Sequence, residues 1–344
     1  MSTETETMGK GLENILGDCL PLARRHFEDK FIEEHAGFLK GLAERCGEFT
    51  DQAYLELPKE LVAEHKEFLL ALAEHCGERT WKVYETLPPH LHPNEYQLIE
   101  RVMKEQGITH WDRYFSNHFP LWQHVFESMT TASPKKPLAV IVHNKNDHNG
   151  AFCRPYAVFY KPHYLDELLH LADYYALYVC EADNRTEAFR HIHRAVSLSK
   201  KRRKISLLVL GGHGNPYSLN LGKTEGTEHE NNDNKKEISR KFEREPERYL
   251  SVLDGARFAD VGKYIHKSGK IVLVSCSTGA ERAKKNLSQV ISEAIPHATV
   301  YAPKVNTVMK RFVFDKKGRV SDVVYQCGPE QTVKLCGGSH VSTE

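Results

Sequence analysis

The fold of this chain is decided by ISLLVLGGHGNP at residues 205–216, read together with KIVLVSCSTG at residues 270–279. Each stretch is a short run of leucine and β-branched residues that ends in a reactive side chain, His213 in the first and Cys276 in the second. A continuous apolar run of this length, bounded by glycine, is typical of a strand buried on both faces. Sites in open α/β sheets form beyond the carboxyl ends of the strands. We therefore expect His213 and Cys276 to lie side by side, which is the minimum for a thiol nucleophile.

Apolar runs and amphipathic stretches alternate around these two motifs. The predicted strands are residues 138–143, 174–180, the two motif runs and 298–302, and the predicted helices are residues 164–172, 186–199, 256–267 and 281–294. Strands separated by helical patterns indicate an α/β fold with a mainly parallel sheet and helices on both faces. Residues 312–315 and 320–325 flank a turn at Gly318 and predict a β-hairpin. The tail from residue 327 is expected to be loose.

The motifs LLVLGGHG at residues 207–214 and IVLVSCSTG at residues 271–279 resemble those of the caspase-like (clan CD) cysteine peptidases. That family carries a hydrophobic strand leading into His-Gly and, later, a hydrophobic strand leading into Cys and small residues. The resemblance extends from residue 137 to the C-terminal region and is nearest to the self-cleaving protease domains of large bacterial toxins. It implies a caspase-like three-layer sandwich and a cysteine endopeptidase that requires no cofactor.

The resemblance also implies roles for individual residues. Cys276 would attack the scissile carbonyl, and His213 would polarise the system and protonate the leaving amine. The amides of Gly214 and Cys276 would form the oxyanion hole, where the loss of one donor typically costs about 10²–10³ in rate. Gly214 suits this role because a missing Cβ lets substrate approach the backbone closely. No third, orienting acid is identifiable.

The residues before the nucleophile, Val274 and Ser275, are expected to line the substrate pocket. In the family, the residue two positions before the cysteine helps to line the primary pocket, and Val274 has no charge to pair with a substrate. This favours an apolar residue before the scissile bond, because burying an unpaired charge is costly. The alternative is an acidic substrate residue held by Arg154, in the loop after the first strand, where caspases place a substrate-binding arginine. The predicted hairpin would flank the substrate groove.

Two charged stretches lie beside the motifs. Lys201, Arg202 and Arg203 precede the histidine strand, and together with Lys310 and Arg311 they would form the basic patch that toxin protease domains use to bind inositol hexakisphosphate as an activator. A solvated loop or a localisation-like run is the plainer interpretation. Residues 222–248 are almost devoid of apolar side chains, which indicates a solvated insertion, either a plain surface loop or an activation and self-processing loop.

The first third of the chain is a helical repeat. Residues 34–61 recur at 64–91, with matched phenylalanine, leucine, cysteine and glycine positions at helical spacing. A period near thirty is typical of stacked helical hairpins, and a degenerate third copy follows. We predict an α-helical repeat domain over residues 1–134 and a peptidase domain over 135–344. The repeats are either a structural spacer or a surface for a protein partner.

Composition narrows the function further. Of the 344 residues, 47 are Lys or Arg and 46 are Asp or Glu, so bulk charge does not favour nucleic acid or membrane partners. The N-terminus lacks a signal-peptide pattern, no stretch has the apolar length of a membrane span, and the eight cysteines form no CxxC pair. These observations favour a cytoplasmic protein. The family resemblance implies a protein or peptide substrate. The alternatives are a catalytically inactive caspase-like scaffold for protein interaction and another thiol hydrolase or acyltransferase.

Overall fold

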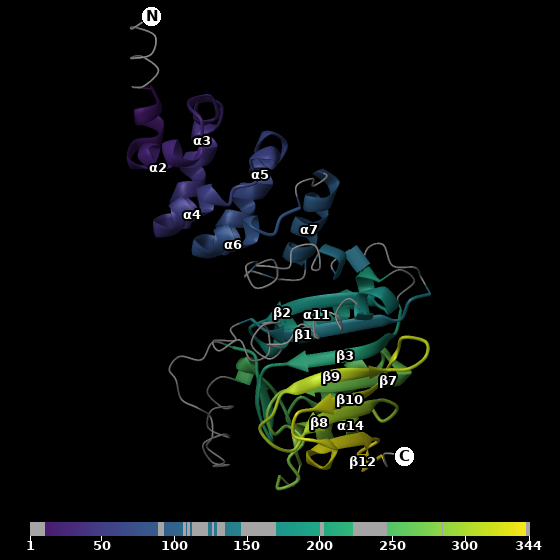
Figure 1. Cartoon of the computed structure of the whole chain (residues 1–344). Helices are drawn as coiled ribbons and strands as arrows, with labels where there is room; N and C mark the ends of the chain where they lie inside the picture. The colour runs from purple at the N-terminus through teal and green to yellow at the C-terminus, as the bar shows by residue number, and fades with distance from the viewer. Residues whose placement is uncertain are drawn as a thin grey trace, which may run out of the picture. The chain divides into compact units, whose positions relative to one another are not determined.

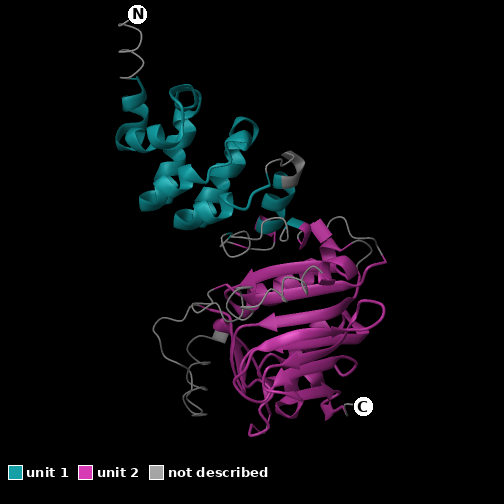
Figure 2. Ribbon diagram, in the orientation of Figure 1, with its two compact units in different colours: residues 1–103, 109–123 teal, residues 104–108, 124–344 magenta. Residues whose placement is uncertain are grey.

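The chain divides into two compact units (Figure 2), formed by residues 1–103 with 109–123 and by residues 104–108 with 124–344. This computed structural model describes residues 11–88, 93–105, 108, 111, 123–125, 127–128, 135–145, 170–199, 203–222, 246–283 and 285–341. None of the helices within these residues combines the length and the apolar character that a bilayer span requires.

The first unit is a series of alternating long and short helices (Figure 1). They are α2 (Leu20–His26), α3 (Asp29–Cys46), α4 (Thr50–Leu55), α5 (Lys59–Cys76), α6 (Thr80–Tyr84) and α7 (Pro93–Glu105). The two predicted repeats have matching geometry. The long helices α3 and α5 end at Gly47 and Gly77, with φ of 55° and 54°, a left-handed conformation that favours glycine. In each copy, a tyrosine hydroxyl of the following short helix donates to a carbonyl of the preceding long helix at 2.8 Å.

The structure contains an earlier copy of this repeat that the sequence comparison missed. Gly17, thirty residues before Gly47, also has a positive φ of 51°, and a 3₁₀ turn (Gly17–Cys19) and α2 follow it as the corresponding turns and short helices follow Gly47 and Gly77. Leu16 is buried at the position of the repeat cysteines. Gly11, Leu12, Gly17 and Ala23 of this copy match Gly41, Leu42, Gly47 and Ala53 of the next. Identities at the thirty-residue offset were therefore an available signal.

The second unit is built on a seven-stranded sheet with the order β12-β11-β8-β7-β3-β1-β2. The strands are β1 (Leu138–Asn144), β2 (Ala176–Ala182), β3 (Ile205–Gly211), β7 (Ile265–Val274), β8 (Thr299–Pro303), β11 (Thr332–Cys336) and β12 (Ser339–His340). The first five strands pair in parallel, and β11 and β12 pair antiparallel. The predicted mixed α/β architecture with a mainly parallel sheet and a helical N-terminal region is therefore confirmed.

Each face of the sheet has its own cover. Helix α13 (Gly255–Gly262) contacts both α11 (Arg185–Leu198) and α14 (Leu287–Ala294), and all three helices share an apolar core with one face. Tyr301 points to the opposite face, since Val300 and Ala302 belong to the helix-side core. Its hydroxyl donates at 3.3 Å to a carbonyl of β10 (Val320–Tyr325), which forms the predicted hairpin with β9 (Met309–Phe314).

Several predicted boundaries were wrong. The helix expected over residues 256–267 ends at Gly262, and strand β7 already begins at Ile265. The helix expected over 281–294 starts at Leu287, because the Asn286 side chain caps it by accepting from the Gln289 amide at 2.9 Å. The second strand begins at Ala176 rather than at residue 174.

The C-terminal tail was also predicted wrongly. Instead of being loose, it adds β11 to the sheet beside β8. Val333 and Leu335 are buried in alternation with partly exposed neighbours, which is the pattern of a half-buried strand. The two glycines that follow, Gly337 and Gly338, have positive φ and turn the chain into β12.

Candidate functional site

The two motif strands lie next to each other in the sheet and end in register. The last parallel pair between β3 and β7 joins Gly211 to Val274, and the Gly212 amide extends the ladder by donating to the Val274 carbonyl at 3.1 Å. His213 and Cys276 each lie two residues beyond that pair. The two predicted reactive residues therefore leave the carboxyl edge of the sheet from neighbouring strands.

Beyond this edge, the histidine segment becomes part of a small second sheet. His213 begins β4 (His213–Asn215), which pairs antiparallel with β5 (Ser218–Asn220), and β5 pairs with β6 (Tyr249–Ser251). Asn215 closes the turn between β4 and β5, because its side-chain oxygen accepts from the Tyr217 and Ser218 amides at 2.8 and 3.1 Å. The backbone of His213 is thus held by a sheet rather than by an open loop.

Gly214 is packed directly against the cysteine segment. A Cβ added there would lie 2.7 Å from the Cys276 carbonyl oxygen, 2.8 Å from the Ser275 Cβ and 3.0 Å from the Thr278 Cγ2. Contacts below 3.0 Å are too short for any side chain, so only glycine fits without displacing its neighbours. The backbones of the two predicted oxyanion donors, Gly214 and Cys276, are therefore in contact.

The thiol of Cys276 is half-buried and lies 3.9 Å from the Thr307 carbonyl oxygen. Burial raises the pKa of this thiol above its ordinary value, because the thiolate would lose hydration. At neutral pH the residue is thus a thiol in the resting protein. Any nucleophilic role requires that the proton leaves as the new bond forms.

This raised pKa gives a direct prediction for alkylation. The rate of reaction of Cys276 with iodoacetamide should keep rising above pH 9, since it follows the thiolate fraction. In the denatured chain, the alkylation rate of the same cysteine should level off once the pH exceeds the free-cysteine pKa of about 8.5. Peptide mapping after timed alkylation at a series of pH values measures both profiles. A plateau at or below neutral pH in the folded protein would contradict the buried-thiol description.

Two of the three residues that were predicted to line the substrate pocket are described by the structure. Val274 ends β7 and is 6% exposed, while Ser275 is 2% exposed and its hydroxyl pairs with that of Thr278 at 2.9 Å. In this structure, the Ser275 hydroxyl therefore stabilises the loop that contains Cys276. Arg154 lies outside the described residues. Whether any of the three contacts a substrate stays a prediction.

A cleft of about 630 Å³ opens beside the site. Gly214 and Ser277 line it from the two motif segments, and residues 304–306, which follow β8, line another wall. Lys304 there forms an ion pair with Glu281 at 2.8 Å. This wall of the cleft was not predicted from the sequence, although its position directly after a parallel strand, at the carboxyl edge, was an available signal.

The predicted effector patch is not assembled by the residues that the structure describes. Arg203 is 9% exposed, and its guanidinium donates to the Lys136 carbonyl at 3.2 Å, so it faces inward. It also precedes β3, at the end of the strand opposite His213. Lys310 and Arg311 are exposed on β9, and Lys201 and Arg202 lie outside the described residues.

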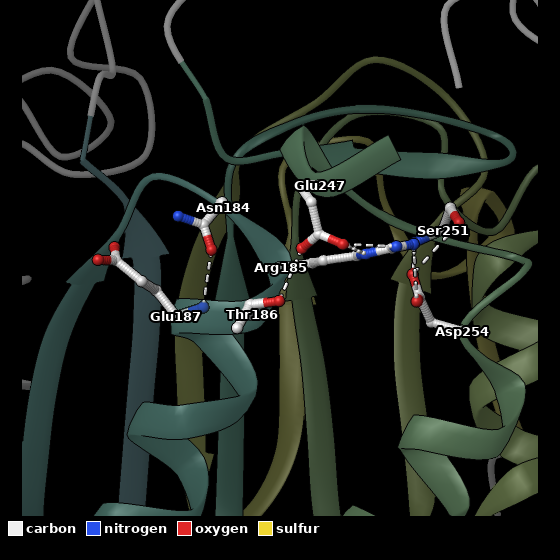
Figure 3. Close-up of polar contacts among 7 residues, drawn as sticks. All are labelled: Asn184, Arg185, Thr186, Glu187, Glu247, Ser251 and Asp254. Carbon is white, nitrogen blue, oxygen red and sulfur yellow. Dashed lines mark hydrogen bonds and ion pairs between the residues drawn. The ribbon is translucent and has the colours of Figure 1, made fainter. Parts of the chain in front are cut away.

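A polar network anchors the small sheet that holds His213 (Figure 3). The Arg185 guanidinium contacts Glu247 at 2.7 Å and Asp254 at 3.4 Å, and the Thr186 hydroxyl donates to Glu247 at 2.7 Å. Asp254 in turn accepts from the Ser251 amide and hydroxyl of β6, at 2.9 and 3.2 Å. Glu247, near the end of the predicted insertion over 222–248, thus connects the insertion to this network. Residues 223–245 lie outside the described part of the chain.

Comparisons of the chain with protein-family models, with curated proteins and with solved structures give no match.

Proposed function

We propose that this protein is a caspase-like cysteine endopeptidase with a His213/Cys276 dyad. The observation that carries the proposal is the common register of the two motif strands, which end at Gly211 and Val274, two residues before His213 and Cys276. Parallel strands deliver their carboxyl ends to one edge of the sheet, where α/β enzymes hold their reactive groups. The order of β2, β1, β3, β7 and β8 across the sheet is a doubly wound order, 2-1-3-4-5 in chain sequence.

The chemistry follows from the protonation state of the thiol. The Cys276 Sγ attacks the scissile carbonyl carbon while its proton passes to the His213 imidazole, since the raised pKa of the thiol disfavours a resting thiolate. The Gly214 and Cys276 amides stabilise the oxyanion. When the C–N bond breaks, His213 returns the proton to the leaving nitrogen, and water then hydrolyses the thioester.

The N-terminal repeats act in this proposal as a regulatory or partner-binding unit, because such arrays present extended surfaces. The charged insertion is the candidate for self-processing. The competing proposal is an inactive caspase-like scaffold that works through protein interaction. The burial that raises the pKa of the Cys276 thiol favours it, since a buried cysteine is often only a packing residue.

Covalent labelling separates the two proposals. A peptidyl acyloxymethyl ketone should label the wild-type protein at Cys276, lose all labelling in Cys276→Ala, and slow at least a hundredfold in His213→Ala. Intact mass and peptide mapping identify the labelled residue. His266→Ala is the matched control, because His266 is an exposed histidine on β7, before the strand reaches the site.

A catalytically inactive scaffold should give a different labelling result. Slow labelling spread over several cysteines, with no difference between wild type and His213→Ala, would refute the dyad. Retention of a cellular effect by Cys276→Ala would point to the scaffold. Addition of inositol hexakisphosphate to the wild-type reaction tests whether this polyphosphate accelerates labelling.

A further inference from the structure

The residue after the proposed nucleophile has an unusual backbone conformation. Among the residues that the structure describes, Ser277 is the one non-glycine residue with a positive φ, at 55°. Residues with a Cβ rarely adopt this left-handed region, and such outliers gather at functional sites where the surroundings enforce them. The conformation therefore needs contacts that hold it.

Those contacts come from the segment after β8. The Ser277 hydroxyl donates to the Asn306 side-chain oxygen at 2.8 Å, and the Ser277 amide donates to the Val305 carbonyl at 3.1 Å. Ser277 itself is 6% exposed, whereas Val305 and Asn306 are exposed, so these bonds are shielded from water on the serine side only. The next turn is fixed as well, because the Gly279 amide donates to the Pro303 carbonyl at 2.9 Å.

The held conformation sets the peptide that joins Cys276 to Ser277. Because φ of Ser277 rotates this peptide, it determines the direction of the Cys276 carbonyl, which is the group lying against Gly214. Rotating the peptide would push this oxygen into Gly214 or draw it away. Either movement changes the spacing between the two amides that the proposed mechanism aims at one oxyanion.

We propose that Ser277 is a positioning residue whose left-handed backbone, held by Asn306, keeps the Gly214 and Cys276 amides in register for the oxyanion. The inference rests on the proposed peptidase function. In this inference, the backbone conformation of Ser277 positions the two amides, and the serine hydroxyl only stabilises that conformation. Asn306 supplies the side-chain part of this hold, beside the backbone bond from the Ser277 amide to the Val305 carbonyl.

Glycine and threonine at position 277 separate the backbone from the hydroxyl. Ser277→Gly removes the hydroxyl but accepts a positive φ freely, whereas Ser277→Thr keeps the hydroxyl and, being β-branched, resists it. We expect Ser277→Thr and Asn306→Ala each to weaken binding of a peptide aldehyde at least tenfold, and Ser277→Gly to weaken it less than threefold. In the Ser277→Gly background, Asn306→Ala should cost less than a further threefold, which is the non-additivity of a coupled pair.

Two probes make the experiment specific. Tripeptide aldehydes ending in leucinal or aspartal bind by forming a hemithioacetal and therefore use the oxyanion hole, whereas iodoacetamide reacts at a saturated carbon and does not. Iodoacetamide rates at Cys276 should stay within twofold of wild type in every variant. Ser292→Ala is the matched control, because this buried hydroxyl also makes one structural bond, accepting from the Gly338 amide at 2.9 Å.

The outcomes distinguish this inference from the function on which it rests. If wild type binds neither aldehyde, or binding survives Cys276→Ala, the peptidase proposal fails and the inference fails with it. If wild type binds through Cys276 but Ser277→Gly is as damaging as Asn306→Ala, the hydroxyl rather than the backbone is responsible, and the inference alone is wrong. If Ser277→Thr does not fold, the comparison of Asn306→Ala in the two backgrounds still decides the question.

Discussion

Replacement of Gly214 by alanine is expected to lower kcat/KM for peptide cleavage at least a hundredfold. The new methyl group would lie 2.7 Å from the Cys276 carbonyl oxygen and 2.8 Å from the Ser275 Cβ. Both neighbours belong to the strand end that carries the proposed nucleophile, so the cysteine segment must move. A displacement of about 1 Å at a reacting centre costs on the order of 10² in rate, and one displaced oxyanion donor costs 10²–10³.

The measurement is steady-state cleavage of a peptide substrate, supported by the affinity of a peptide aldehyde. Gly255→Ala is the matched control, since its added Cβ would meet only the Val290 Cγ1, at an ordinary 3.6 Å. That variant should keep wild-type activity. Gly214→Ala with activity within a few-fold of wild type would show that the two backbones are not as close as described.

Replacement of Arg185 by alanine is expected to destabilise the second unit by about 2 kcal/mol, because it removes a charged hydrogen-bond partner from the buried carboxylate of Asp254. Asp254 is 3% exposed and, when the guanidinium is removed, keeps its bonds from Ser251 and the weaker attraction of Arg257. Burial already raises the pKa of Asp254 despite the nearby Arg185. Loss of that arginine should raise it further.

The sign of the pH dependence follows from this shift. A carboxyl with a raised pKa in the folded state becomes protonated there at a pH where the unfolded chain, with a pKa of about 3.9, is still ionised. The destabilisation by Arg185→Ala should therefore be full at pH 7 and shrink as the pH falls toward 4. A penalty that grew on acidification would contradict the assignment to Asp254.

Hydrogen exchange followed by mass spectrometry measures the effect where it occurs, in the peptides that cover β5, β6 and the start of α11. All three tryptophans, Trp81, Trp111 and Trp122, belong to the first unit, so tryptophan fluorescence should report an unchanged helical transition. Arg190→Ala is the matched control on the same helix. Its pair with Glu187 at 3.3 Å is exposed, and such pairs contribute about 0–1 kcal/mol.

The central strands and the helical repeat were predictable because their signals are local. β3 and the second half of β7, residues 271–274, are apolar runs that lead into glycine or serine. Burial on both faces requires such a run wherever it lies in the chain. The long repeat helices α3 and α5 follow one apolar face and end at a glycine with positive φ. Neither inference depended on knowing a distant partner.

The element ends that were predicted wrongly are set by local sequence signals that were present but weak. The Asn286 cap shortened α14, and the glycine pair at 337–338 turned the tail into a strand pair instead of releasing it. Arg203 was expected in a basic surface patch, yet its guanidinium is drawn to a backbone carbonyl 67 positions away in the chain. The sequence gives the charge of such a residue but not the direction in which its side chain points.

The sequence by itself determined that His213 and Cys276, the two residues predicted to be reactive, follow buried strands in this order. Only the tertiary structure decided that the two strands are neighbours in register, that Gly214 contacts the cysteine backbone, and that Ser277 is held in a left-handed conformation by Asn306. The physical reason is the range of the interactions. Periodicity and end signals act within about ten residues, whereas these contacts join segments some thirty to sixty residues apart, through backbone atoms that every residue type possesses.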